Sequence, residues 1–93
     1  MDARVGKRLA LRRISDARGR FALLALDQRP PIFQLVARVR PELDEKAVWR
    51  EVSELKARAA RALAPWATGV LLDPLYGGEA LAYLPREVGL LLA

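Results

Sequence analysis

Hydrophobic runs alternate along the chain with segments of helical spacing, and this alternation predicts an α/β fold. Continuous apolar runs at residues 21–26 and 68–72 predict two strands buried on both faces, because a half-exposed strand would show alternating polar positions. A third apolar run at residues 88–93 predicts a third strand. Helical segments lie between these runs, and strand, helix, strand, helix, strand is the order of parallel α/β folds.

The clearest helical pattern begins at Asp44 and continues over residues 45–64, where Pro65 ends it. Apolar side chains recur there at spacings of three and four, which predicts one buried face. We expect this face to contain Val48, Val52, Leu55, Ala59 and either Ala62 or Leu63.

Shorter helices are predicted at three further places, residues 2–14, 32–37 and 79–84. Asp2 is the expected cap of the first helix, and residues 15–19 form a turn after it. Pro30-Pro31 cannot continue a central strand, and they favour the start of the second helix.

Both complete strands end in an aspartate, Asp27 after the first strand and Asp73 after the second. In parallel α/β folds, the groups that touch ligands lie just past the carboxyl ends of the strands. The two aspartates are therefore expected on the same rim of the sheet, on neighbouring strands.

The residues that follow the first strand combine three kinds of polar group. Arg29 offers a rigid fork of donors suited to a phosphate. Gln28 can both donate and accept, which suits sugar hydroxyls, and Asp27 could orient a basic group or accept from a hydroxyl. Together they predict a site for a polyhydroxylated phosphate ester. The alternative is structural: Asp27 caps the next helix and pairs locally with Arg29, while Gln28 is solvated.

The residues that follow the second strand leave a similar choice open. Asp73-Pro74 followed by Gly77-Gly78 is typical of an ordinary turn, although the glycines could also cradle a phosphate. Tyr76 is either a stacking or hydroxyl contact for a ligand or a lid over the core.

Length and composition narrow the function classes. The 93 residues suit one small domain, and we treat residues 1–93 as a single segment. The absence of cysteine and histidine excludes disulfides, thiolate chemistry, Cys/His zinc sites and histidine acid–base catalysis. No apolar run approaches the roughly 18–20 residues that span a bilayer, and no secretory signal is present, so we expect a cytoplasmic protein without a membrane partner.

Positive charge is concentrated in residues 1–20, a basic leader made of the first helix and turn. This leader holds seven basic groups and two acids, whereas the remaining 73 residues hold nine of each. Such a segment fits nucleic acid or an anionic surface, but it also fits a solvated helical face or a patch covered by a larger protein. Because no nucleic-acid-binding motif accompanies it, we do not expect a nucleic-acid partner.

Three separated motifs stand in this order along the chain: RISDARGRFALLALDQR, LLDPLYGGEAL and EVGLLLA. They resemble the amino-terminal part of the tagatose-bisphosphate aldolase family of class I aldolases, which includes relatives acting on sulfofructose phosphate. The resemblance covers residues 7–93. It departs from the family after D-Q-R, where glycine and a small residue are usual and this chain has Pro30-Pro31.

The resemblance implies a (β/α)₈ TIM barrel, of which this chain would carry the first βαβαβ portion. It also implies cleavage of tagatose 1,6-bisphosphate or a related ketose phosphate to dihydroxyacetone phosphate and an aldehyde, through a lysine Schiff base and without a metal or other cofactor. By similarity, Asp27 is a candidate catalytic residue, and Gln28, Arg29 and Asp73 are candidate substrate contacts.

The Schiff-base lysine of the family lies on a later strand, which would fall beyond Ala93. The chain has three lysines: Lys7 in the leader, Lys46 at the start of the long helix, and Lys56 beside that helix's apolar face. None is expected at a strand's carboxyl end or in the buried, cation-flanked setting that activates an amine.

We therefore expect an incomplete barrel without aldolase turnover. Its expected partners are the sugar phosphate and either the remainder of the barrel or a second copy. The alternative function is a non-catalytic sugar-phosphate-binding or assembly module with a basic leader.

Overall fold

Three short parallel strands form the centre of the structure, a computed structural model that describes residues 3–93. The strands are β1 (Leu23–Leu26), β2 (Gly69–Leu72) and β3 (Gly89–Leu92), and they lie in the order β1-β2-β3. Leu26 is paired with Leu72, and Leu72 with Leu92, so the carboxyl ends of all three strands reach one edge. The predicted α/β class and parallel order are confirmed for this part of the chain.

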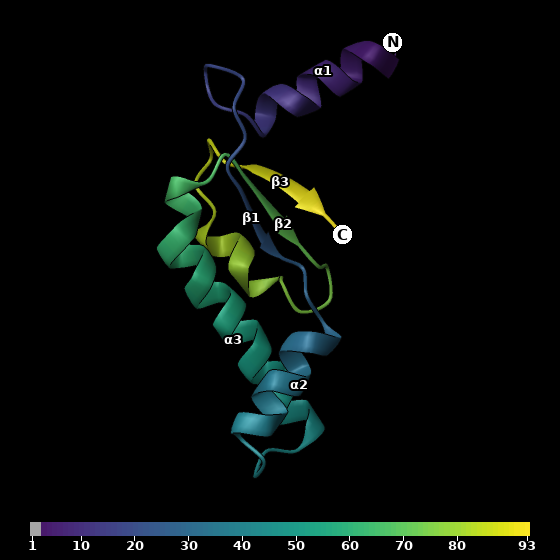
Figure 1. Cartoon of the computed structure of the whole chain (residues 1–93), viewed down its shortest axis with the longest axis vertical. Helices are drawn as coiled ribbons and strands as arrows, with labels where there is room; N and C mark the ends of the chain where they lie inside the picture. Colours follow the sequence, from purple (N-terminus) through teal and green to yellow (C-terminus); the bar gives the residue numbers. More distant parts are fainter. Residues whose placement is uncertain (1–2) are drawn as a thin grey trace.

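The helices extend the molecule at both ends of this sheet (Figure 1). Helix α1 (Ala3–Arg13) projects beyond the amino ends of the strands, whereas α2 (Pro30–Val39) and the start of α3 (Glu45–Leu63) lie beyond their carboxyl ends. Two 3-10 helices complete the fold, η1 (Ala64–Trp66) and η2 (Glu79–Tyr83). This arrangement gives an elongated shape of 51 × 26 × 19 Å.

Local sequence signals account for most of the element boundaries. Asp44 caps α3, because its side chain accepts a 2.8 Å hydrogen bond from the Ala47 amide. Asp16 holds the predicted turn by accepting from the Arg18 and Arg20 amides, and Gly19 supplies the positive φ of 74°. The predicted helix of residues 79–84 is a 3-10 helix, and the proposed cap Asp2 lies outside the described residues.

The core lies on one face of the sheet, where α3 and η2 pack against the strands. Its fully buried members are small or branched side chains: Ala60, Ala64, Val70, Leu72 and Ala80. Leu24 and Leu26 of β1 pack against this cluster and are partly buried. The core therefore joins α3 and η2 to β1 and β2.

The prediction that β1 is buried on both faces is wrong. Its burial alternates residue by residue, and Leu23 is 52% exposed, as is its neighbour Phe21 at 54%. The physical reason is that α3 covers one face, whereas the other stays open in the described part of the chain. Strand β2, which lies between β1 and β3, is buried along most of its length, as predicted.

The predicted apolar face of α3 is rotated from the observed one. Val48 and Val52 are buried as expected, but Leu55 is 37% exposed and the buried stripe continues through Lys56 and Ala60 instead. The buried stripe follows a spacing of four residues. Its small alanine side chains allow the helix to lie close to the sheet.

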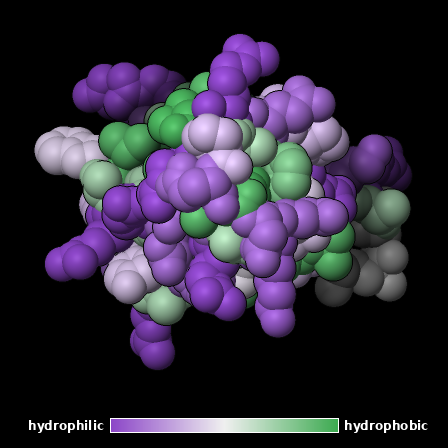
Figure 2. Space-filling model, turned by 90° about the horizontal axis from the view of Figure 1, so that it is seen from below, coloured by the Kyte–Doolittle hydropathy of each residue, from purple (hydrophilic) through white to green (hydrophobic). Residues whose placement is uncertain are grey.

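The outer surface carries mainly polar side chains at the α2 end of the molecule. Seen from that end, hydrophilic side chains cover most of the surface and apolar areas lie between them (Figure 2). Among the described helices, none combines the length and the apolar character needed to cross a membrane.

Candidate functional site

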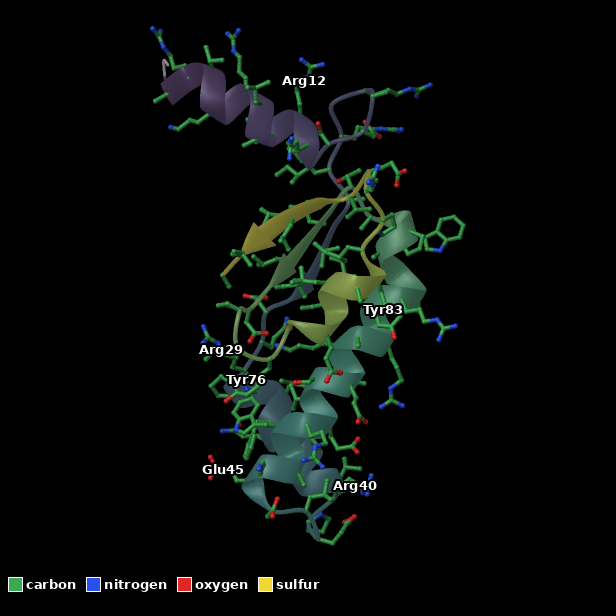
Figure 3. The ribbon with its side chains drawn as sticks, turned by 180° about the vertical axis from the view of Figure 1, so that it is seen from behind. Arg12, Arg29, Arg40, Glu45, Tyr76 and Tyr83 are labelled. Atoms are coloured by element: carbon green, nitrogen blue, oxygen red, sulfur yellow. The ribbon has the colours of Figure 1, made fainter. Side chains whose placement is uncertain are left out.

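The carboxyl ends of β1 and β2 form the rim that the sequence predicts. Because Leu26 and Leu72 are register partners in parallel strands, Asp27 and Asp73 leave the sheet at the same edge. Arg29 and Tyr76 lie at this end of the sheet, one on each of the two loops (Figure 3). The common rim is thus confirmed at the level of the backbone.

The side chains of residues 27–29 stand at the first strand end without local partners. Asp27 and Arg29 are half-buried, Gln28 is exposed, and none of the three side chains makes a hydrogen bond or ion pair within the described residues. The structural alternative, in which Asp27 caps the helix and pairs with Arg29, is not what the structure shows.

Helix α2 begins without a side-chain cap. Its N-cap residue is Arg29, whose carbonyl oxygen accepts from the Phe33 amide at 3.0 Å. Two prolines occupy the first helical positions, where a missing N–H costs no hydrogen bond and the fixed φ suits a helix. Pro30-Pro31 therefore start the helix, and the polar side chains before them are not needed for capping.

At the second strand end, a lysine and an aspartate form an ion pair in the interior. The Lys56 ammonium donates to Oδ1 of Asp73, and the two residues are only 3% and 1% exposed. Lys56 is therefore buried and reaches a strand end from α3, a setting that the sequence analysis did not anticipate. Its neighbouring charge is a carboxylate, however, and not the second cation that activates a nucleophilic amine.

The second oxygen of Asp73 is also occupied. Oδ2 accepts from the Tyr76 amide at 2.7 Å, while the Asp73 carbonyl accepts from the Gly77 amide at 3.1 Å. A Cβ atom on Gly77 would lie 2.6 Å from that carbonyl oxygen, so only glycine fits there. Because the Gly77 amide is used within the turn, the structure favours an ordinary turn over a phosphate cradle.

These contacts decide the ionisation of Asp73. Burial alone would raise the pKa of this carboxyl, because a charge is poorly solvated in the interior. The hydrogen bonds from Lys56 and the Tyr76 amide, with the positive charge of Lys56, outweigh burial and hold the pKa of Asp73 below its ordinary value. Asp73 is thus a carboxylate at neutral pH.

Three aromatic rings connect the two loops of the rim. Trp49 of α3 stacks on Tyr76 with ring centroids 3.8 Å apart and planes within 4° of parallel. The same indole contacts Phe33 of α2 at 4.6 Å, with planes tilted by 45°. Tyr76 therefore stacks on a side chain of the protein itself, and the sequence analysis did not predict this partner.

Sequence reasoning missed Lys56 and Trp49. A signal for Lys56 was present, because the spacing 48, 52, 56, 60 places it on the face of α3 that already held two buried valines. A buried lysine requires a carboxylate, and Asp73 is the buried acid of the described chain. Within the described residues, no group of His, Cys, Asp or Glu side chains could hold a metal ion.

Comparisons with known proteins point in the same direction as the sequence motifs. No family model matches the chain. Its relatives include tagatose 1,6-diphosphate aldolase 1 of Streptococcus mutans and the tagatose 1,6-diphosphate aldolases of Lactococcus lactis and Streptococcus pneumoniae, which are 38%, 39% and 39% identical over 87 residues.

These alignments cover 94% of this chain but only 26% of each relative, so the chain spans about a quarter of the length of the proteins it matches. Over almost its entire length, the chain is therefore a homologue of an amino-terminal segment of the tagatose 1,6-diphosphate aldolases, the family that its motifs indicated.

Proposed function

We propose that the rim formed by β1 and β2 is part of the sugar-phosphate site of a class I ketose-bisphosphate aldolase. The observation that carries this proposal is that the Arg29 side chain lies at the strand end without a hydrogen-bond partner in the described chain. Arg29 is half-buried at a strand's carboxyl end, and its guanidinium makes no hydrogen bond within the described chain, so its donors are available to a phosphate. The names of the relatives supply the substrate class, a tagatose 1,6-bisphosphate.

Each residue of the first loop has a chemical role in this proposal. Arg29 would bind phosphate oxygens through its fork of donors, and the exposed Gln28 amide would bond to sugar hydroxyls. Asp27 would accept from a hydroxyl or orient a basic group of the reaction. Asp73, whose two carboxylate oxygens accept from Lys56 and the Tyr76 amide, offers no oxygen to the ligand.

The proposal includes a larger fold. Residues 1–93 would form the first βαβαβ portion of a (β/α)₈ barrel, whose catalytic face is the carboxyl edge of the strands. The Schiff-base lysine would come from a later strand of that barrel and not from this segment. The reaction itself, cleavage to dihydroxyacetone phosphate and an aldehyde, is proposed for the whole barrel.

Calorimetric titration of the 93-residue chain with tagatose 1,6-bisphosphate tests the site. Loss of the charge-assisted bonds in Arg29→Ala should weaken binding about tenfold or more. Arg38→Ala is the matched control, because it removes the same charge from the exposed last turn of α2. Equal affinities for the two variants would remove Arg29 from the site.

A second function, assembly with an acidic partner protein, is favoured by the surface of helix α1. Helix α1 buries none of its residues, carries five basic side chains and has no acid in its first turn. A helix of this kind is suited to an acidic protein surface. Equal binding of the chain and of a variant lacking residues 1–13 to an acidic partner protein would count against this alternative.

A further inference from the structure

Asp73 differs from the other polar groups of the rim because neither of its carboxylate oxygens is free. One accepts from the Lys56 ammonium and the other from the Tyr76 amide, and the residue is 1% exposed. In this arrangement Asp73 does not present an oxygen to a ligand. Its contacts instead hold the loop that follows β2.

Helix α3 holds that loop at two points. Lys56 binds Asp73 at the start of the loop, and Trp49 stacks on Tyr76 three residues further along it. Trp49 and Lys56 are seven residues apart, or about two turns, so both lie on the side of α3 that faces the rim. Charge and ring stacking thus fix the same short loop to the same rigid helix.

The aromatic contact continues to the first loop. Trp49 also touches Phe33, whose amide donates to the Arg29 carbonyl in the first turn of α2. A continuous chain of contacts therefore runs from Asp73 through Tyr76, Trp49 and Phe33 to the backbone of Arg29. It joins the two loops that follow β1 and β2.

We propose that Lys56 and Trp49 are positioning residues of the rim. Together they hold the Tyr76 side chain in one position beside the Arg29 loop. Lys56 acts through Asp73, and Trp49 acts through its stacked ring. That the position of Tyr76 affects ligand binding rests on the proposed function, since it follows only if Arg29 binds a sugar phosphate. The positioning itself does not depend on that function.

Stability alone is a weak reason for such a pair. Replacing both partners of a buried ion pair by apolar residues of similar size is often neutral or stabilising, because the cost of desolvating the two charges can exceed their mutual attraction. A merely structural pair could therefore be replaced without disturbing its surroundings. A positioning pair could not, because Asp73→Leu removes the oxygen that accepts from the Tyr76 amide.

The experiment uses Trp66→Phe as background, since Trp66 is 84% exposed and Trp49 then remains as the sole tryptophan. The test variant is the double substitution Lys56→Met/Asp73→Leu. The control is Arg40→Ala, which breaks an ion pair of 2.7 Å between the exposed side chains of Arg40 and Glu42. Near-ultraviolet circular dichroism reports the Trp49–Tyr76 stack, and amide hydrogen exchange reports the Tyr76 bond.

The double variant should keep its far-ultraviolet helical signal, lose the near-ultraviolet signal of the stack, and exchange the Tyr76 amide about tenfold faster or more. The control should change neither. A double variant that retains both the stack and the slow Tyr76 amide would overturn the proposal.

A second measurement needs no variant at positions 56 or 73 to fold. In the background protein, the Tyr76 amide should exchange at least about tenfold more slowly than the exposed Gly78 amide, relative to their unstructured rates. Equal protection of the two amides would also overturn the proposal.

Titration with tagatose 1,6-bisphosphate separates this inference from the proposed function. If both hold, the double variant should bind several-fold more weakly although it retains Arg29. If Arg29→Ala leaves affinity unchanged while the exchange results stand, the sugar-phosphate function fails and the positioning survives. If Arg29→Ala weakens binding but the double variant does not, the link between Lys56 and the site is overturned.

Discussion

Lys56 and Asp73 are 17 residues apart in sequence, yet they meet in the interior and bind each other with side chains that are 4% and 0% exposed. One lies in the middle of α3, and the other follows the last residue of β2. Their contact joins the longest helix of the described chain to the strand that lies between the other two. Removing the charge of one partner leaves the other charge buried without its counter-ion.

Lys56→Met alone should therefore destabilise the chain strongly. Removing one partner of a buried pair costs about 3–5 kcal/mol, because the remaining carboxylate stays desolvated. A domain of this size has about 5–15 kcal/mol in total, so this variant should unfold at a much lower urea concentration. Urea titration followed by circular dichroism measures the difference. A loss below about 1 kcal/mol would show that Asp73 reaches water or another donor once Lys56 is gone.

Acid should weaken the same pair. The pKa of Asp73 is lower in the folded chain than its ordinary value of 3.8, so folding favours the carboxylate form. The stability that Asp73 contributes is fully present above that ordinary value and is lost as the pH falls through the depressed folded pKa. The measurement is the free energy of unfolding between pH 6 and pH 2, at intervals of about half a unit.

A comparison of variants isolates the contribution of Asp73 to the acid limb, the fall in the free energy of unfolding at low pH. Lys56→Met/Asp73→Leu should show a shallower loss of stability below pH 4 than the unmodified chain, because it has no carboxylate at position 73 to protonate. Asp16 also has a lowered pKa, chiefly through hydrogen bonding from the Arg20 backbone, and it retains its part of the acid limb in both proteins. Identical acid limbs would contradict the assignment to Asp73.

Local signals in the sequence were sufficient for most elements of the fold. Asp44 as the start of α3 and Pro30-Pro31 as the start of α2 were predicted correctly, because caps and prolines act on adjacent backbone. The three strands and their shared rim followed from apolar runs and from the rule for parallel sheets. These features depend on few contacts distant in the chain.

Burial was harder to predict, because it depends on what covers each face. The apolar run of residues 21–26 does not say whether one face or both will be covered, and Leu23 is exposed as a result. The face of α3 was misjudged because Leu55 is more hydrophobic than Lys56, although Lys56 lies in the interior. Only the position of Asp73 opposite the helix makes that lysine acceptable there.

Gly77→Ala should disturb the rim loop, whereas Gly78→Ala should not. A Cβ atom on Gly77 would lie 2.6 Å from the Asp73 carbonyl oxygen and 3.3 Å from the Leu72 side chain, and the backbone oxygen cannot turn away. Overpacking of this kind costs about 1–3 kcal/mol. Gly78 has open space around it, so it provides a matched control. Thermal unfolding of both variants decides the matter, and equal midpoints would show that the loop shifts freely.

Lys56 should form no covalent adduct with dihydroxyacetone phosphate. An amine forms a Schiff base only when it is unprotonated and can reach the carbonyl carbon. The Lys56 residue is 3% exposed and its nitrogen is bound to Asp73, so a carbonyl carbon has no access to a free nitrogen there. Incubation of the 93-residue chain with dihydroxyacetone phosphate and borohydride should therefore leave no reduced adduct on Lys56, as judged by peptide mass spectrometry. The exposed Lys46 serves as the internal control for nonspecific reduction. An adduct on Lys56 in excess of that on Lys46 would show that the ion pair opens to substrate, and it would place the reactive lysine within this segment.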